Sequence, residues 1–197
     1  DAAEIMWRFG TWFAPPITVR GKETADGSAM AGRIVMVRRD DAPVIIDAGG
    51  GYGGSYAMRL SYNSISTVAY NGAGASTAET MDKARLKFAN KRAESWWRMR
   101  EALDPSQEGG SAIALPPDDE LKADLASVHW KLAQKGIQLE PKDDIKDRIG
   151  RSPGKGDVAV MCLAEGNVAT SRRLGGYAGG KRPTVKTGYG HIAGRRK

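Results

Sequence analysis

Cysteine and histidine are scarce in this sequence of 197 residues, which contains one cysteine, Cys162, and two histidines, His129 and His191. A single cysteine cannot form a disulfide within the chain, and a zinc site built from cysteine and histidine needs more ligands than these. A metal ion bound here would therefore be held by carboxylates, which favours Mg²⁺ or Mn²⁺. The scarcity of cysteine also suits a reducing compartment.

Long apolar runs are absent as well. No stretch approaches the roughly 20 residues of a membrane-spanning helix, and the first residues lack the basic and apolar segments of a secretory signal. The pattern G-x-x-x-x-G-K-[ST], which forms the phosphate loop of many ATPases, does not occur. A content of 41% hydrophobic and 27% charged residues suits a soluble globular protein with one well-buried core.

Acidic residues are missing from segment 166–197, which contains eight Lys or Arg and no Asp or Glu. The net charge of +7 therefore belongs to this segment and not to residues 1–165. Its many glycines and its lack of an apolar period predict a disordered tail after a domain at 1–165. Such a tail either stays solvated or binds a polyanion such as DNA. The candidate DNA contacts in it are Arg172, Arg173, Lys181 and Arg182.

Strand and helix patterns alternate along residues 1–165. Apolar runs between turn residues predict strands at 2–13, 43–47 and 65–70, and a hairpin at 128–140. Helical spacing predicts helices at 29–39, 55–62, 83–103, 117–127, 142–150 and 155–165. This alternation predicts an α/β domain with a mixed sheet flanked by helices.

The first candidate for chemistry is Asp47, which ends the apolar run Val44-Ile-Ile-Asp47 just before a glycine-rich stretch. Open α/β sheets bind ligands at the carboxyl ends of their strands. A carboxylate at the end of a buried strand needs water or a partner, and a metal ion is one such partner. The simpler interpretation is an aspartate that starts a turn.

The same glycine-rich stretch also fits the dinucleotide pattern G-x-G-x-x-G at Gly49, Gly51 and Gly54. A nucleotide-binding protein is therefore a rival interpretation. The acidic residue that such proteins carry at the end of the next strand is missing, because that strand ends at Tyr70-Asn71.

The second candidate is Asp157, which precedes the apolar segment from Val158 to Leu163. In the first turn of a helix, a carboxylate is stabilised by the free N–H groups and the helix dipole, so a helix-start aspartate is the simpler interpretation. Lys155, two residues earlier, either contacts phosphate or is a solvated lysine. Cys162 lies inside the apolar segment and is expected to pack in the core.

These two candidates, about 110 residues apart, occur within an ordered series of blocks that resembles the nuclease domain of tailed-phage terminase large subunits. The resemblance covers roughly residues 1–165. Its blocks are Arg8-Phe-Gly-Thr-Trp-Phe13, Gly21-Lys-Glu-Thr-Ala-Asp-Gly27, Ile46-Asp-Ala-Gly-Gly-Gly-Tyr-Gly-Gly54, Asn71-Gly-Ala-Gly-Ala-Ser76, Asn90-Lys-Arg-Ala-Glu-Ser-Trp-Trp97, Ile113-Ala-Leu-Pro-Pro-Asp118, Lys142-Asp-Asp-Ile145 and Gly150-Arg-Ser-Pro153.

The resemblance implies a ribonuclease-H-like fold with acidic residues clustered at one sheet edge. In that family the acids hold two Mg²⁺ or Mn²⁺ ions, which hydrolyse phosphodiester bonds of concatemeric double-stranded DNA. Asp47 matches the second acid of the family and Asp157 the late acid on the last helix. The resemblance also implies contacts with the portal, the small terminase subunit and an ATPase domain, in the cytoplasm of a host cell.

The chain departs from the family at its start, where the first strand and its acid are expected to be missing. Asp1 stands where a loop aspartate follows that strand, and is a third, weaker candidate for a metal ligand. The ATPase domain is absent from this sequence. We therefore expect weak DNA cleavage or none. The same fold would also suit a nucleic-acid-binding remnant without activity, or a nuclease specific for Holliday junctions.

Overall fold

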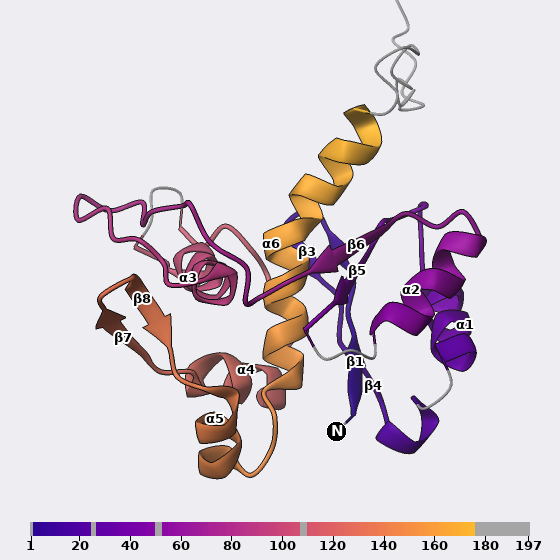
Figure 1. Cartoon of the computed structure of the whole chain (residues 1–197), viewed down its shortest axis with the longest axis horizontal. Helices are drawn as coiled ribbons and strands as arrows, with labels where there is room; N and C mark the ends of the chain where they lie inside the picture. The colour runs from indigo at the N-terminus through magenta and orange to yellow at the C-terminus, as the bar shows by residue number, and fades with distance from the viewer. Residues whose placement is uncertain (1, 25–26, 50–52, 107–109, 176–197) are drawn as a thin grey trace, which may run out of the picture.

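The long helix α6 (Gly154–Gly175) passes through the middle of the molecule, and the other elements lie on either side of it (Figure 1). The computed structural model describes residues 2–24, 27–49, 53–106 and 110–175. Helices α1 (Gly27–Val37) and α2 (Gly53–Tyr62) lie on one side. On the other side lie α3 (Lys91–Leu103), α4 (Asp119–Ser127), α5 (Lys142–Ile149) and the hairpin of β7 (Trp130–Ala133) and β8 (Gly136–Leu139).

Two separate strand pairs lie between α6 and the helices α1 and α2. Strand β1 (Ala3–Ile5) pairs antiparallel with β4 (Ile17–Val19). Strand β5 (Val44–Asp47) pairs in parallel with β6 (Thr67–Tyr70), and Asp47 lies opposite Tyr70. The mixture of parallel and antiparallel pairs with helices on both sides confirms the predicted α/β class.

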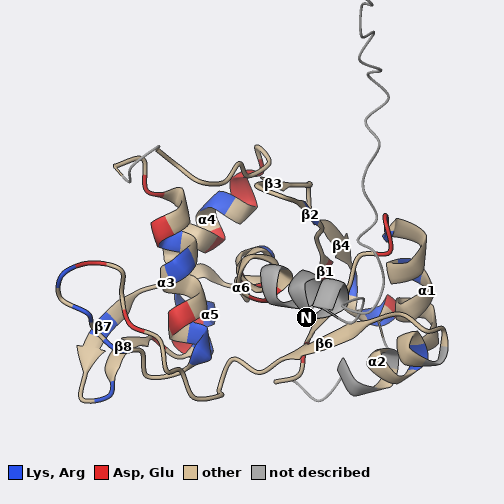
Figure 2. Ribbon diagram, turned by 90° about the horizontal axis from the view of Figure 1, so that it is seen from above, with Lys and Arg blue, Asp and Glu red and all other residues tan. Residues whose placement is uncertain are grey.

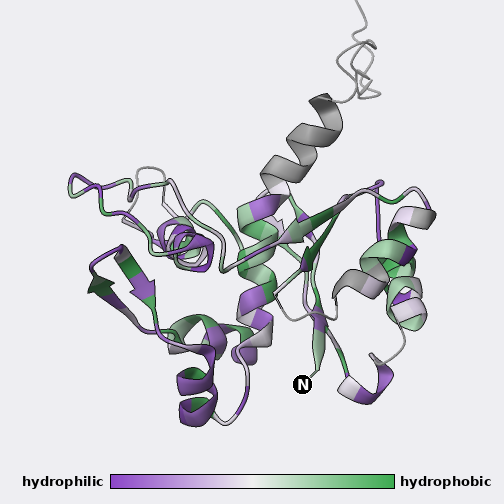
Figure 3. Cartoon of the chain, in the orientation of Figure 1, coloured by the Kyte–Doolittle hydropathy of each residue, from purple (hydrophilic) through white to green (hydrophobic). Residues whose placement is uncertain are grey.

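Hydrophobic residues occur in these strands and in helices on both sides of them, as the green segments in Figure 3 show. One core packs the two strand pairs against α1 and α2. It is built from Val19, Met30, Ala31, Ile34, Ile46, Leu60 and Ile65. The other core packs α6 against α3 and α4. It is built from Met6, Phe13, Trp96, Met99, Leu121, Ala159 and Val160. Helix α6 thus belongs to the second core, and a third, smaller cluster of Phe88, Ala93, Trp97 and Ile137 packs α3 against β8.

The helix predicted at 83–103 begins only at Lys91, so the prediction for its first eight residues was wrong. The side chain of Asn90 accepts a hydrogen bond from the Ala93 N–H at 2.9 Å and caps the helix there. The preceding backbone pairs with β8 instead: Ile137 N–H donates to Lys87 O at 2.7 Å, and Ala89 N–H donates to Ile137 O at 2.9 Å. Contact with a distant strand therefore prevails over local helix propensity.

Several further segments differ from the sequence prediction. The strand expected at 2–13 is divided into β1, β2 (Arg8–Phe9) and β3 (Trp12–Phe13), with a positive-φ turn at Gly10. Helix α6 continues beyond residue 165, where a tail was predicted, to Gly175. The 3₁₀ turn η1 (Gly21–Glu23) was not predicted. Strand β4 was not predicted either, because its stretch contains proline and glycine and was expected to be mostly loop. The remaining elements agree with the predicted segments within a few residues. No helix in the described ranges is long and apolar enough to cross a membrane.

Gly136 is required for the approach of the β7–β8 hairpin to residue 87. Its φ is +106°, and a Cβ there would lie 2.1 Å from Lys87 O. We expect Gly136→Ala to lower the free energy of unfolding by about 3 kcal/mol, because strain and overpacking add. Gly150→Ala is the control, since Gly150 has φ +75° with nothing within 4 Å of its Cβ position. It should cost only about 1 kcal/mol. If urea unfolding showed that both variants lose the same free energy of unfolding, the close approach of Gly136 to Lys87 would be contradicted.

Candidate functional site

The two acids singled out in the sequence line the same hollow, which has a volume of about 1170 Å³. Asp47 is the last residue of β5, and Asp157 lies in the first turn of α6. Glu4, in the middle of β1, lines the same hollow. The structure thus brings together three carboxylates from distant parts of the chain, one of which was not predicted.

Strand alternation explains why these carboxylates share a side of the sheet. Ala3, Ile5, Val44 and Ile46 pack toward α1 and its core. The intervening residues Glu4 and Asp47 therefore point to the opposite face, which α6 covers. A Cβ on Gly154, the first residue of α6, would lie 3.2 Å from the Glu4 Cγ, so Glu4 lies directly beneath the start of that helix.

Asp157 is fixed by two side chains and is only 19% exposed. The ammonium of Lys142 lies 2.8 Å from its Oδ2. The indole N–H of Trp96 donates to its Oδ1 at 3.3 Å. An aspartate that merely starts a helix needs neither partner, so its position is set by α3 and α5 as well as by α6.

Asp47 is exposed, and its Oδ1 accepts a hydrogen bond from the Gly49 N–H at 2.9 Å. This is the turn-forming contact that the simpler interpretation of the sequence predicted. The contact orients the carboxylate at the carboxyl end of β5, so the turn interpretation and a ligand-binding role are compatible.

A metal ion of the kind that the resemblance implies needs a closer cluster than these residues provide. Within the described ranges, no group of three His, Cys, Asp or Glu side chains lies close enough to hold an ion. Asp1, the third predicted ligand, lies outside those ranges. The carboxylates that are placed therefore do not by themselves fit a metal centre.

Two groups near the acids carry shifted pKa values. Burial raises the pKa of Glu4, although the Thr18 hydroxyl donates to its Oε2 at 2.8 Å and opposes the shift. Burial raises the pKa of Tyr70 to about 12, and the nearby charges of Asp157 and Asp47 add to this effect. Tyr70 therefore stays neutral, and its hydroxyl donates to Ser95 Oγ at 3.1 Å.

Sequence reasoning missed Glu4, Tyr70, Trp96 and Lys142 as members of the site. The alternation of β1 was the one local signal for Glu4. Lys142 was noted only within a charged block, and nothing in the local pattern distinguishes it from a solvated lysine at a helix start. Its contact with Asp157 is tertiary and spans α5 and α6.

The start of α6 is anchored on α4. The buried carboxylate of Asp124 accepts a hydrogen bond from the Gly156 N–H at 3.1 Å and pairs with Arg151. The side chain of Lys155 is 13% exposed, and its ammonium lies 2.9 Å from carboxylate oxygens of both Asp118 and Glu120. Lys155 therefore makes an internal contact and is not the solvated lysine that was one of its two interpretations. The predicted contact of Lys155 with phosphate gains no support from this geometry.

The side chains of the other residues predicted to contact DNA lie outside the part of the chain that the structure describes. Arg172 and Arg173 belong to the last turns of α6, where side chains are outside the description, and Lys181 and Arg182 lie outside the described residues. Residues 50–52 of the Gly49–Gly54 stretch also lie outside them. In Figure 2, the helices α3, α4 and α5 carry both basic and acidic residues.

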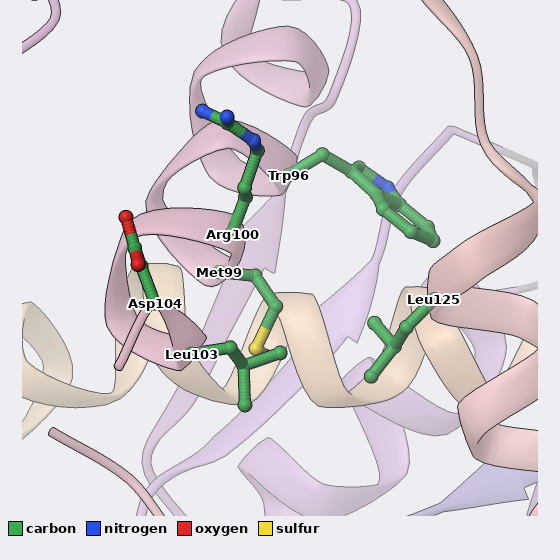
Figure 4. Close-up of a pocket in the computed structure, with 6 residues that line it drawn as sticks. All are labelled: Trp96, Met99, Arg100, Leu103, Asp104 and Leu125. Carbon is green, nitrogen blue, oxygen red and sulfur yellow. The ribbon is translucent and has the colours of Figure 1, made fainter. Parts of the chain in front are cut away.

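A second, smaller hollow of about 360 Å³ lies between α3 and α4 (Figure 4). Its walls are the apolar side chains of Trp96, Met99, Leu103 and Leu125, with Arg100 and Asp104 at its edge. It contains no cluster of nucleophilic or metal-binding groups among the residues that line it. Trp96 connects the two hollows, because its indole N–H reaches Asp157.

Gly156 allows α6 to approach α3 and α4 closely enough to place Asp157. A Cβ at this position would lie 2.9 Å from Trp96 Cη2 and 3.0 Å from Asp124 Cβ. We expect Gly156→Ala to lower the free energy of unfolding by about 1–3 kcal/mol in urea unfolding. Gly32→Ala in α1 is the control, because nothing lies within 4 Å of its Cβ position. That change should stabilise the protein by about 0.5–1 kcal/mol. A stabilising Gly156→Ala would show that α6 is less tightly packed.

Cys162 also lines the large hollow, and burial raises the pKa of its thiol to about 11, from an ordinary value of 9.0. At pH 8 its thiolate fraction should be roughly 100-fold below that of the unfolded chain, so alkylation by iodoacetamide should be slower by that factor. Because the unfolded chain releases this proton first, stability should fall as the pH rises from 9 toward 11. Rapid alkylation of the folded chain at pH 8 would contradict the burial.

Two solved structures have a similar fold, and both are of the nuclease domain of the large terminase subunit gp2 of bacterial virus Sf6. One shares 18% sequence identity with this chain. The other, at 17% identity, is a K428A mutant with manganese and β-thujaplicinol. Each match covers 83% of this chain and 82% of the solved chain, with a TM-score of 0.63. No protein-family model and no curated protein matches the sequence. The fold is thus that of a terminase nuclease domain, as the sequence resemblance predicted.

Proposed function

We propose that this chain is a DNA endonuclease domain of a phage terminase and that its site is the edge formed by Asp47 and Asp157. One observation carries the proposal: two acids 110 residues apart in the sequence, which the resemblance matched to acids of the family, line one hollow in a fold shared with a terminase nuclease domain. Asp47 lies at the carboxyl end of a strand and Asp157 at the start of a helix, and α/β sheets bind their ligands at such an edge.

The chemistry requires Mg²⁺ or Mn²⁺, for which carboxylate oxygens are suitable ligands. Bound at such an edge, two ions would activate water and stabilise the leaving oxygen of the phosphodiester. Asp47 and Asp157 are two of the ligands in this proposal, and a further ligand is needed from outside the described residues. We therefore expect slow cleavage by this chain.

Lys142 has a defined part in the proposal. Its ammonium now neutralises Asp157 at 2.8 Å. A cation at Asp157 would repel this ammonium, and a DNA phosphate at the same edge would attract it. Lys142 is thus placed to contact the DNA backbone when the site is occupied, and to neutralise Asp157 when it is not.

The partners of the proposed domain are double-stranded DNA, the portal, the small terminase subunit and an ATPase domain. A second candidate function is DNA binding without cleavage. It is favoured by the absence of a three-ligand group among the described residues and by the ion pair that occupies Asp157.

Nicking of supercoiled plasmid with Mn²⁺ tests the proposal. We expect slow nicking by the chain and a loss of roughly 100-fold or more in Asp47→Asn and in Asp157→Asn, because each removes a charged oxygen ligand. Asp147→Asn is the control, since Asp147 is an exposed aspartate of α5 outside the hollow. It should nick at the rate of the unaltered chain.

Binding to a fluorescent DNA duplex at several salt concentrations completes the experiment. Salt-dependent binding by all four proteins, with no nicking by any of them, would favour the second candidate function over cleavage. Nicking that persists in both site variants would place the reaction elsewhere in the protein and reject the proposed site.

A further inference from the structure

The large hollow separates the two strand pairs. Segment 2–10, which contains β1, lines one wall, and segment 43–47, which contains β5, lines the opposite wall. No residue of β4 or β6 is among its described lining residues. The order across the molecule is therefore β4, β1, the hollow, β5 and β6.

The edge of β5 that faces the hollow carries backbone groups suited to another strand. The N–H of Val44 donates to Ser66 O at 2.8 Å, and that of Ala48 donates to Tyr70 O at 2.9 Å, so these groups point to β6. Because alternate residues of a strand direct their backbone groups to opposite sides, those of Ile45 and Asp47 point into the hollow. Strand β1 pairs with β4 along the edge that faces away from the hollow, so its other edge faces the hollow.

The two edges run in opposite directions. Glu4 lies beside Gly154 at the start of α6, and Met6 O accepts a hydrogen bond from the Cys162 thiol farther along that helix. Strand β1 thus runs in the direction of α6. The hydroxyl of Tyr70, the last residue of β6, donates to Ser95, and the neighbouring Trp96 donates to Asp157 near the start of α6. The end of β6 therefore lies near the start of α6, so β6 and its parallel partner β5 run the other way. A strand inserted between them would pair antiparallel with one edge and in parallel with the other.

The two faces of the hollow are apolar. Helix α1 contributes Met30 and Ile34 on one face, and α6 contributes Val158, Met161 and Cys162 on the other. A strand covered on both faces is characteristically a continuous run of Val, Ile and Leu. Charged side chains also line the hollow: Glu4, Asp47, Asp157 and Lys142 lie near the start of α6, and Arg8, Arg38 and Arg39 lie elsewhere on its rim. The side chains that α1 and α6 present between these charges are apolar, which favours a strand with apolar side chains as the occupant.

We propose that this hollow is a binding slot for an extended apolar strand of polypeptide, about four to six residues long, which joins β1 and β5 into one five-stranded mixed sheet. The slot supplies a backbone edge on two sides and an apolar helix on each face. Strand addition of this kind obtains affinity from main-chain hydrogen bonds and selectivity from the side-chain pockets. The slot shares the hollow with Asp47 and Asp157 but goes beyond the proposed nuclease chemistry, because strand binding requires neither a metal ion nor DNA.

The probe is an acetylated, amidated eight-residue peptide with four consecutive Val or Ile residues between flanking glycines and terminal lysines, labelled with fluorescein. We expect saturable binding to the full chain in fluorescence polarisation, and a higher melting temperature of the chain with the unlabelled peptide. The same peptide with N-methyl groups on alternate residues should not bind, because it cannot donate to either edge.

Two proline variants locate the binding site. Ile45→Pro removes an N–H that points into the slot while leaving the bonds between β5 and β6 in place, and it should weaken binding at least about 10-fold. Ala69→Pro is the matched control, because the register places Ala69 opposite Ile46 with its N–H directed away from β5. It should bind the peptide as the unaltered chain does. Both variants should first show unchanged near-ultraviolet circular dichroism.

Several outcomes would contradict the proposal that the hollow binds a strand. They are the absence of saturable binding up to the solubility limit of the peptide, equal binding by the N-methylated peptide, and a loss in Ala69→Pro but not in Ile45→Pro. A dimer of the peptide-free chain in light scattering that Ile45→Pro abolishes would assign the slot to a second copy instead. Plasmid nicking by the same proteins is a separate readout, so failure of the nuclease proposal leaves this result unaffected.

Discussion

The structure depends on how the start of α6 is held. The buried carboxylate of Asp124 accepts the N–H of Gly156, and Lys155 is paired to α4 through Asp118 and Glu120. A buried charge is costly unless it is paired and hydrogen-bonded, so these contacts fix one orientation of α6 on α4. The absence of a side chain at Gly156 permits that approach. The position of Asp157, one residue later, follows from it, and so does the wall that α6 forms along the hollow.

The environment of Asp157 links this packing to chemistry. Its two oxygens meet a neutral donor, the Trp96 indole, and a charged one, the Lys142 ammonium. Lys142 is 45% exposed, so this ion pair contributes little to stability after screening by solvent. A weak, exposed ion pair is readily exchanged for a divalent cation, whereas the contact with Trp96 keeps the carboxylate in place. The arrangement therefore suits a site whose occupancy changes.

Asp47 and Asp157 could be picked as candidates because each sits at a boundary with a local signal, a short apolar run followed by glycine and a turn followed by a helix, and because the resemblance matches both. The class of the fold and most elements followed from periodicity in the same way. The helix predicted at 83–103 begins only at Lys91 because Lys87 and Ala89 pair with Ile137, about 50 residues away. Lys142 and Tyr70 were missed for the same reason. Their partners in the site are distant in sequence, and a local pattern does not predict such contacts.

The hollow explains why three acids lie near one another without forming a cluster. Glu4 stands on one wall and Asp47 on the other, and the gap between their strands separates them. Neighbouring strands of a continuous sheet lie about 4.8 Å apart, so a gap wide enough for one more strand places these walls at roughly twice that spacing. A strand in the slot would not bring the two acids together. It would cover the apolar lining, exclude water beside Asp47 and add one residue of its own between them. The character of that residue would then decide whether the edge binds a cation.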